Sequence, residues 1–144
     1  MGFLSNILGS KPDFPELDAN HPAVGYLNTH AENIEKLIEQ VSSPLEVVPT
    51  EETSYVFIGK PPKKFGIAWF DPKGPIVNFK TLVDQKGLMV PTLDRLSEKL
   101  KDAYIQHQAE PRFVTKIKSR DIVVTPSEDL IADVKKVIKE VVGE

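Results

Sequence analysis

The sequence predicts a single α+β domain, with a mainly antiparallel sheet of about five strands flanked by helices, in the order helix, three strands, helix, two strands, helix. The chain of 144 residues has the length of one domain and holds no repeat or linker that would divide it. Segments of helical and of strand periodicity follow one another in that order. Its composition, 40% hydrophobic and 27% charged, is typical of soluble globular proteins.

The first part of the chain predicts two helices joined by an extended segment. Residues 1–10 have apolar side chains on one side of a short amphipathic helix, and residues 11–19 form a connector with two prolines. Asn20 or His21 can cap the next helix, with Pro22 in its first turn. The apolar positions of this helix follow helical spacing: Val24, Leu27, Ala31, Ile34, Ile38 and Val41.

The sequence GKPPKKFG at residues 59–66 is expected to form the tip of a β-hairpin. Apolar strands flank it on both sides, and Leu45 to Val48 predict a further strand before them. Pairing Gly59 with Gly66 would set the register of the hairpin. One face would then carry Val56, Ile58, Ile67 and Trp69, and the other Tyr55, Phe57, Ala68 and Phe70.

Both faces of this expected hairpin are apolar, which is unusual for an antiparallel sheet with one face in water. Each face must therefore be covered by helices of this chain, by a second copy of it, or by a ligand or peptide. Exposed aromatic patches mark interaction sites. Tyr55, Phe57 and Phe70 are accordingly the candidate residues of a partner-binding or ligand-binding face.

The second half of the chain predicts three helices around another hairpin. Asn78 caps a short helix that ends at Gly87, and a longer helix follows from about Thr92 to Gln108. The second hairpin runs from Phe113 to Val124. In the last helix, Thr125 and Glu128 form an expected capping box around Pro126, and lysines lie toward the carboxyl end.

This order of elements resembles the secretion-chaperone-like fold of type III secretion chaperones, which are small acidic homodimers that bind unfolded segments of partner proteins. The resemblance covers most of the chain as a string of predicted elements. It includes no sequence motif, so no functional residue is carried over. It implies self-association and protein binding. The order is also compatible with a profilin-like or another helix-flanked antiparallel sheet.

Several kinds of chemistry lack a signature in the sequence. There is no cysteine, which excludes disulfides, thiolate metal sites and cysteine nucleophiles. His21, His30 and His107 do not have the spacing of metal ligands, so no metal or cofactor is expected. No nucleophile motif occurs, which argues against an enzyme. An active site assembled in space from scattered residues, such as His107 and Asp71, stays a third hypothesis.

The net charge of −3 conceals a marked asymmetry along the chain. Residues 1–58 hold two bases and nine acids, residues 59–120 hold thirteen bases and six acids, and residues 121–144 hold three bases and six acids. The basic middle could form a nucleic-acid surface, but the acidic balance and the apolar setting of its aromatic rings argue against one. Three lysines of the hairpin tip remain candidates for binding an anion: Lys60, Lys63 and Lys64.

We expect a cytoplasmic protein, because no apolar run is long enough to span a membrane and the first residues lack the pattern of a signal peptide. The amphipathic residues 1–10 contain no lysine or arginine, which argues against membrane binding. The leading hypothesis for function is a non-enzymatic protein-interaction module that could form a homodimer. The alternative is a small-molecule or anion-binding domain that uses residues 59–66 and the aromatic face.

Overall fold

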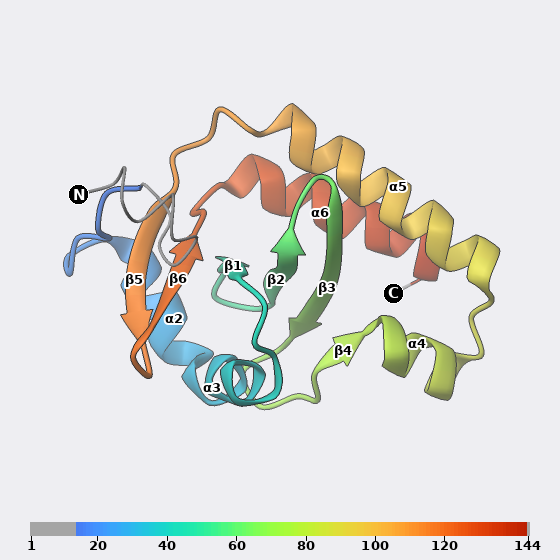
Figure 1. Cartoon of the computed structure of the whole chain (residues 1–144), viewed down its shortest axis with the longest axis horizontal. Coiled ribbons are helices and arrows are strands. Elements are labelled where there is room, and N and C mark those ends of the chain that lie inside the picture. The colour runs from blue at the N-terminus through green and yellow to red at the C-terminus, as the bar shows by residue number, and fades with distance from the viewer. Residues whose placement is uncertain (1–13, 144) are drawn as a thin grey trace.

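A computed structural model describes residues 14–143 and shows an α+β fold in which a six-stranded sheet lies between two layers of helices (Figure 1). The helix expected at residues 1–10 and the first part of the connector lie outside the described residues. In chain order the elements are α2 (Pro22–Thr29), α3 (Ala31–Gln40), β1 (Leu45–Val48), β2 (Ser54–Lys60), β3 (Lys64–Phe70), β4 (Val77–Asn78), α4 (Phe79–Lys86), α5 (Val90–Gln106), β5 (Phe113–Ile117), β6 (Arg120–Val124) and α6 (Glu128–Val142).

The strands follow the spatial order β4-β3-β2-β1-β6-β5. Neighbours are antiparallel except for β1 and β6, which are parallel. The prediction of a mainly antiparallel sheet is confirmed, but the sheet has six strands and is mixed. Parallel strands need a long crossover connection, and here the chain from β2 through α5 to β5 supplies it.

Helices of this chain cover both faces of the sheet. The layer of α2 and α3 packs on one face, and α5 and α6 run side by side across the other (Figure 1). The first core includes Leu27, Ile34, Leu37, Val47, Val56, Ala68, Phe70 and Val124. The second includes Val48, Tyr55, Phe57, Ile67, Trp69, Leu100, Tyr104 and Val134. The two apolar faces of the central hairpin are therefore explained by coverage within one chain.

The register predicted for the central hairpin is wrong by one residue. Gly59 faces Phe65 instead of Gly66, and Tyr55 faces Trp69. The cause is the tip, where Lys60 pairs with Lys64 and leaves a three-residue loop. Gly59 has a φ of 111°, a conformation that favours glycine, and it allows this loop to close. Because side chains alternate along a strand, the one-residue shift changes which side chains share each face.

Helix ends agree with the sequence at α4 and differ at α6. Asn78 caps α4 and Gly87 ends it in the left-handed conformation, as predicted. Thr81 completes a reciprocal capping box with Asn78 that was not predicted. The predicted cap Thr125 is wrong: Ser127 accepts the hydrogen bond that caps α6, from the amide of Leu130. No helix within residues 14–143 is long and apolar enough to cross a membrane.

Candidate ligand-binding pocket

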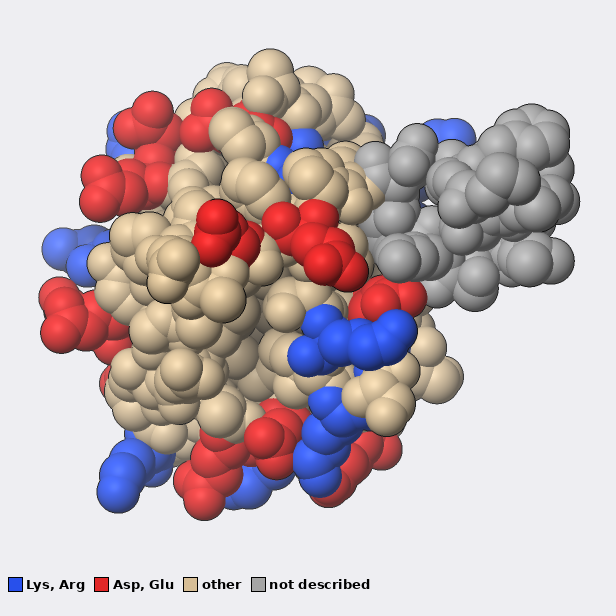
Figure 2. Space-filling model, turned by 90° about the vertical axis from the view of Figure 1, so that its left-hand side faces the viewer, with Lys and Arg blue, Asp and Glu red and all other residues tan. Residues whose placement is uncertain are grey.

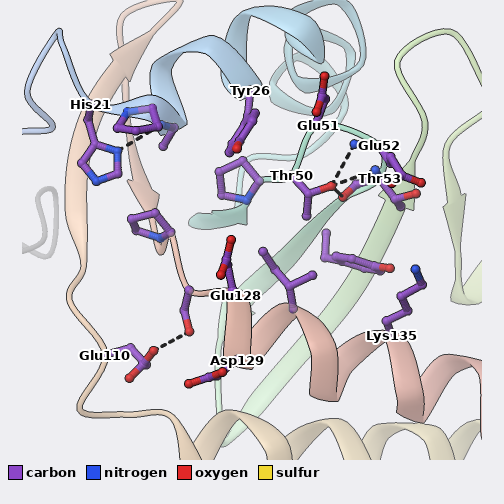
Figure 3. Close-up of a pocket in the computed structure, with 17 residues that line it drawn as sticks. His21, Tyr26, Thr50, Glu51, Glu52, Thr53, Glu110, Glu128, Asp129 and Lys135 are labelled. Atoms are coloured by element: carbon purple, nitrogen blue, oxygen red, sulfur yellow. Dashed lines mark hydrogen bonds between the residues drawn. The ribbon is translucent and has the colours of Figure 1, made fainter.

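A pocket with a volume of about 650 Å³ opens where the two parallel strands β1 and β6 end (Figure 3). Three segments form its walls: the start of α2, the loop at residues 49–53 after β1, and the residues at 126–129 that lead into α6. In sheets that contain parallel strands, the crevice beyond the carboxyl ends of these strands is the common place for a ligand. The topology thus places the pocket where ligand sites occur.

The loop at residues 49–53 is held by its own hydrogen bonds (Figure 3). The Thr50 hydroxyl accepts from the amides of Glu52 and Thr53 at 3.0 Å and donates to the Thr53 carbonyl at 2.7 Å. The Thr50 carbonyl accepts from Nε2 of the fully buried His30 at 2.8 Å. The loop is therefore fixed, while the side chains of Glu51 and Glu52 stay exposed at the pocket.

The start of α6 forms a second fixed wall. The Ser127 hydroxyl accepts from the Leu130 amide at 3.1 Å and donates to the Glu110 carboxylate at 2.5 Å. This pair ties the connection after α5 to the first turn of α6. Glu128 and Asp129 follow on that turn with exposed side chains. Carboxylates are stabilised there by the partial positive charge at the amino end of a helix.

The third wall is the start of α2, where the prediction of His21 as a cap is confirmed. Nδ1 of His21 accepts from the Ala23 amide at 3.0 Å, so the neutral ring carries its proton on Nε2. The His21 ring also packs against Phe113, with 5.6 Å between the ring centroids. Tyr26 on α2 and Glu128 on α6 extend toward each other from opposite walls (Figure 3).

The lining of the pocket is negatively charged. The lining has one cationic side chain, Lys135, and a neutral His21 ring. It has five carboxylates: Glu51, Glu52, Glu110, Glu128 and Asp129. The amino ends of α2 and α6 each add only about half a positive charge. Together these positive charges offset roughly two of the five negative charges, and the potential in the pocket stays negative.

Tyr55 is the sequence candidate that reaches the pocket. The residue is only 5% exposed and lines the cavity, and its hydroxyl makes no hydrogen bond to another described residue. Burial, followed by the charges of Asp71 and Glu52, raises the pKa of Tyr55, so the phenol stays neutral at ordinary pH. An unpartnered phenol at the wall of a cavity is available to a ligand as donor and acceptor.

The expected aromatic face does not form. Tyr55 and Phe57 lie in the core under α5 and α6, whereas Phe70 lies in the core under α2 and α3. Phe57 is 0% and Phe70 1% exposed. The one-residue change in register separates these rings, and the helices on both faces bury them. Phe57 and Phe70 therefore serve packing, and only Tyr55 remains as a candidate binding residue.

The lysines of the hairpin tip do not reach the pocket. Lys60, Lys63 and Lys64 are exposed at the tip of the β2–β3 hairpin. The pocket lies at the other end of this hairpin, where β2 begins. Acidic and basic side chains are interspersed on the face shown in Figure 2. On this face folding mixes the charges that are separated along the sequence.

The histidines have structural partners. Nε2 of His107 lies 2.6 Å from Oδ2 of Asp133, and the Thr53 hydroxyl donates to Asp71 at 2.7 Å. The pairing of His107 with Asp71, considered for an enzyme site, is therefore replaced by two separate contacts. Within residues 14–143 no group of three or more His, Asp and Glu side chains is placed to hold a metal ion.

Sequence reasoning missed a buried polar network beside the pocket. The Glu46 carboxylate accepts from the hydroxyls of Tyr104 at 2.7 Å and Thr125 at 2.6 Å, and from Nε of Arg112 at 3.2 Å. The Arg112 guanidinium also lies 5.0 Å from the centre of the Tyr104 ring. The sequence could have indicated this network through Glu46, the single acid in the apolar strand Leu45–Val48, because a buried carboxylate needs hydrogen-bond partners.

Comparisons with protein families, with curated proteins and with solved structures give no match for this chain. The resemblance to secretion chaperones stays an expectation from the order of elements. The proposals below depend on the geometry of the pocket alone.

Proposed function

We propose that the protein is a small non-enzymatic binding module and that the pocket between α2, residues 49–53 and α6 is its binding site. One observation carries the proposal: a cavity of about 650 Å³ opens at the carboxyl ends of the parallel strands. This volume lies within the range of small-molecule sites, roughly 300–1,000 Å³. The site replaces the buried aromatic face as the place where a partner or ligand would bind.

The walls of the pocket are organised before any ligand binds. Hydrogen bonds of Thr50, Ser127 and His21 fix the loop, the start of α6 and the start of α2, respectively. Binding to a site that is already ordered avoids the loss of conformational entropy that a flexible loop would bring. This order supports a binding role for a pocket whose floor and walls come from separate parts of the chain.

The hydroxyl groups of the pocket support binding better than catalysis. Ser127 has a carboxylate partner in Glu110, but the residue is 3% exposed and its oxygen caps α6. The Thr50 hydroxyl is fully engaged within its loop. A nucleophile must be accessible and next to a free base. Neither hydroxyl meets both conditions, so we favour a module that binds without chemical change.

A fragment screen by two-dimensional NMR tests the proposal. With a library of cationic, neutral and anionic fragments, specific hits should shift the amides of residues 50–53 and 128–131 in a saturable way. Ile131→Trp, which adds bulk at a lining residue, should weaken these hits. Ile105→Trp, at a 43% exposed position on α5, is the matched control. Hits that shift only amides far from the pocket would contradict the proposal.

A further inference from the structure

We infer that the ligand of this pocket carries an organic cation, an ammonium or guanidinium group joined to an apolar body. The inference rests on the proposed function, because it assigns a ligand class to the same pocket. It combines three features of the lining: the excess of carboxylates, two tyrosines whose hydroxyls make no hydrogen bond to another described residue, and apolar wall residues. Each feature narrows the chemistry of the ligand further.

The carboxylates select for positive charge. Glu110 already accepts a hydrogen bond from Ser127. The side chains of Glu128, Asp129 and Glu52 have no ionic or hydrogen-bonded partner among the described residues. Glu128 points into the space between α6 and α2 (Figure 3). A ligand ammonium placed there would make charge-assisted hydrogen bonds, which are about twice as strong as neutral ones. An anionic ligand would meet net repulsion.

Tyr55 is an observation independent of the acids. Its side chain is almost entirely buried, yet the hydroxyl at the pocket makes no hydrogen bond to another described residue. A phenol oxygen accepts a hydrogen bond from an ammonium or guanidinium group. The ring of Tyr26, which is only partly buried, also offers a face that attracts a cation within about 6 Å. The tyrosines and the carboxylates thus favour the same class of ligand.

The remaining wall residues favour an organic ion over a bare metal ion. The apolar ones among them are Pro22, Ala23, Pro49, Pro126 and Ile131. The described residues also lack a cluster with the geometry for a metal. The cation could be a free amine or the side chain of a lysine in a peptide. The chemistry at the pocket would be the same, and the experiment separates the two sources.

Three probes of matched shape test the charge preference by NMR titration of the full chain: 4-phenylbutylamine, 4-phenylbutanol and 4-phenylbutyrate. The amine should shift the amides of residues 50–55 and 128–131 and bind about tenfold more tightly than the alcohol. Its affinity should fall as salt is added, because the carboxylates are exposed to solvent. A capped Phe-Lys dipeptide, with its Nε-acetylated form as reference, tests the peptide source.

Two variants test which residues contact the bound cation. Glu128→Gln should weaken the amine about tenfold, and Tyr55→Phe, which keeps the ring but removes the hydroxyl, about threefold. The matched control is Glu98→Gln on α5, which alters the net charge equally at an exposed position outside the pocket. It should leave binding unchanged. Far-UV circular dichroism verifies that each variant is folded.

The outcomes separate this inference from the proposed function. If the alcohol or the butyrate binds at the same amides as tightly as the amine, the pocket is a binding site and the preference for a cation is wrong. If none of the probes or the dipeptide shifts these amides, the ligand class is wrong, and the broader fragment screen alone then decides the proposed function. Equal loss of affinity in Glu98→Gln and Glu128→Gln would also overturn the inference.

Discussion

Arg120 connects the first residue of β6 to the carboxyl end of α3. Its guanidinium donates to the carbonyls of Ile38 at 3.2 Å, Val41 at 2.5 Å and Ser43 at 2.6 Å. The last carbonyls of a helix have no partner within the helix, and a planar group with several donors can serve more than one of them. This side chain is thus a cap for α3 and is not available to a nucleic-acid surface.

We expect Arg120→Ala to lower the free energy of unfolding by about 2 kcal/mol, because it removes charged donors from partly buried carbonyls. Arg120→Lys should restore less than half of the loss, since an ammonium group does not have the planar set of donors of a guanidinium group. Urea denaturation measures both. The control is Lys118→Ala, which removes only exposed ion pairs with Glu35 and Glu39 and should leave the midpoint nearly unchanged. Equal loss in all three variants would contradict this role of Arg120.

His30 makes the stability depend on pH. The residue is fully buried between α2 and α3, and Nδ1 has no partner among the described residues. Burial lowers its pKa below the ordinary 6.5, although the carbonyl of Thr50 and the charge of Asp71 act in the opposite direction. The unfolded chain therefore takes up a proton more readily than the folded one. Stability is complete above pH about 6.5 and decreases as the pH falls below it.

We expect the melting temperature of the wild type to fall between pH about 7.5 and pH about 5. His30→Gln, which can still donate to the Thr50 carbonyl but does not titrate, should show a smaller fall. Differential scanning calorimetry in matched buffers measures the difference. A His30→Gln curve as steep as that of the wild type would assign the acid sensitivity to other groups.

At the scale of elements, the tip of the central hairpin depends on one of its two glycines, Gly59. A Cβ atom on Gly59 would lie 2.8 Å from the carbonyl oxygen of Lys64, and the φ of 111° disfavours any side chain there. A Cβ atom on Gly66, in the facing strand, would have nothing within 4 Å. The two glycines are therefore a matched pair, of which only one is required by the backbone.

We expect Gly59→Ala to lower the free energy of unfolding by about 2 kcal/mol, from strain and the close contact. Gly66→Ala should be neutral or raise it by up to about 1 kcal/mol, because alanine loses less entropy than glycine in a strand. Urea denaturation followed by the fluorescence of Trp69 measures both. Similar effects of the two substitutions would show that Gly59 does not fix the loop.

The periodicity of apolar residues predicted most helices and strands, but it does not predict contacts between segments that are distant in the sequence. Continuous runs of apolar residues identified β2 and β3, since a strand that is buried on both faces needs apolar side chains on both. The register depended on the backbone of Gly59, which the pattern of side chains does not encode. Thr125 fits a capping motif, yet its hydroxyl is needed by Glu46, a residue 79 positions away. The pocket likewise combines loops and caps that look ordinary one at a time.

At the scale of the whole molecule, the sheet couples the two helical layers. Leu37 on α3 and Leu100 on α5 are both almost completely buried, in cores on opposite faces. Successive residues of the same strand, such as Val56 and Phe57, belong to different cores. A strand cannot lose its packing on one face while keeping its position on the other, because the backbone is shared. The two layers should therefore unfold together.

We expect Leu37→Ala and Leu100→Ala each to lower the free energy of unfolding by about 2–5 kcal/mol. The single tryptophan, Trp69, lies in the core of Leu100 and reports directly on that face. Its fluorescence midpoint in urea should nevertheless shift in Leu37→Ala, and it should coincide with the midpoint from far-UV circular dichroism in both variants. Exposed Ile105→Ala on α5 is a control that should shift the midpoint much less. If Leu37→Ala moves the circular dichroism transition and leaves the Trp69 transition in place, the layers unfold separately and the sheet does not transmit the loss of packing from one face to the other.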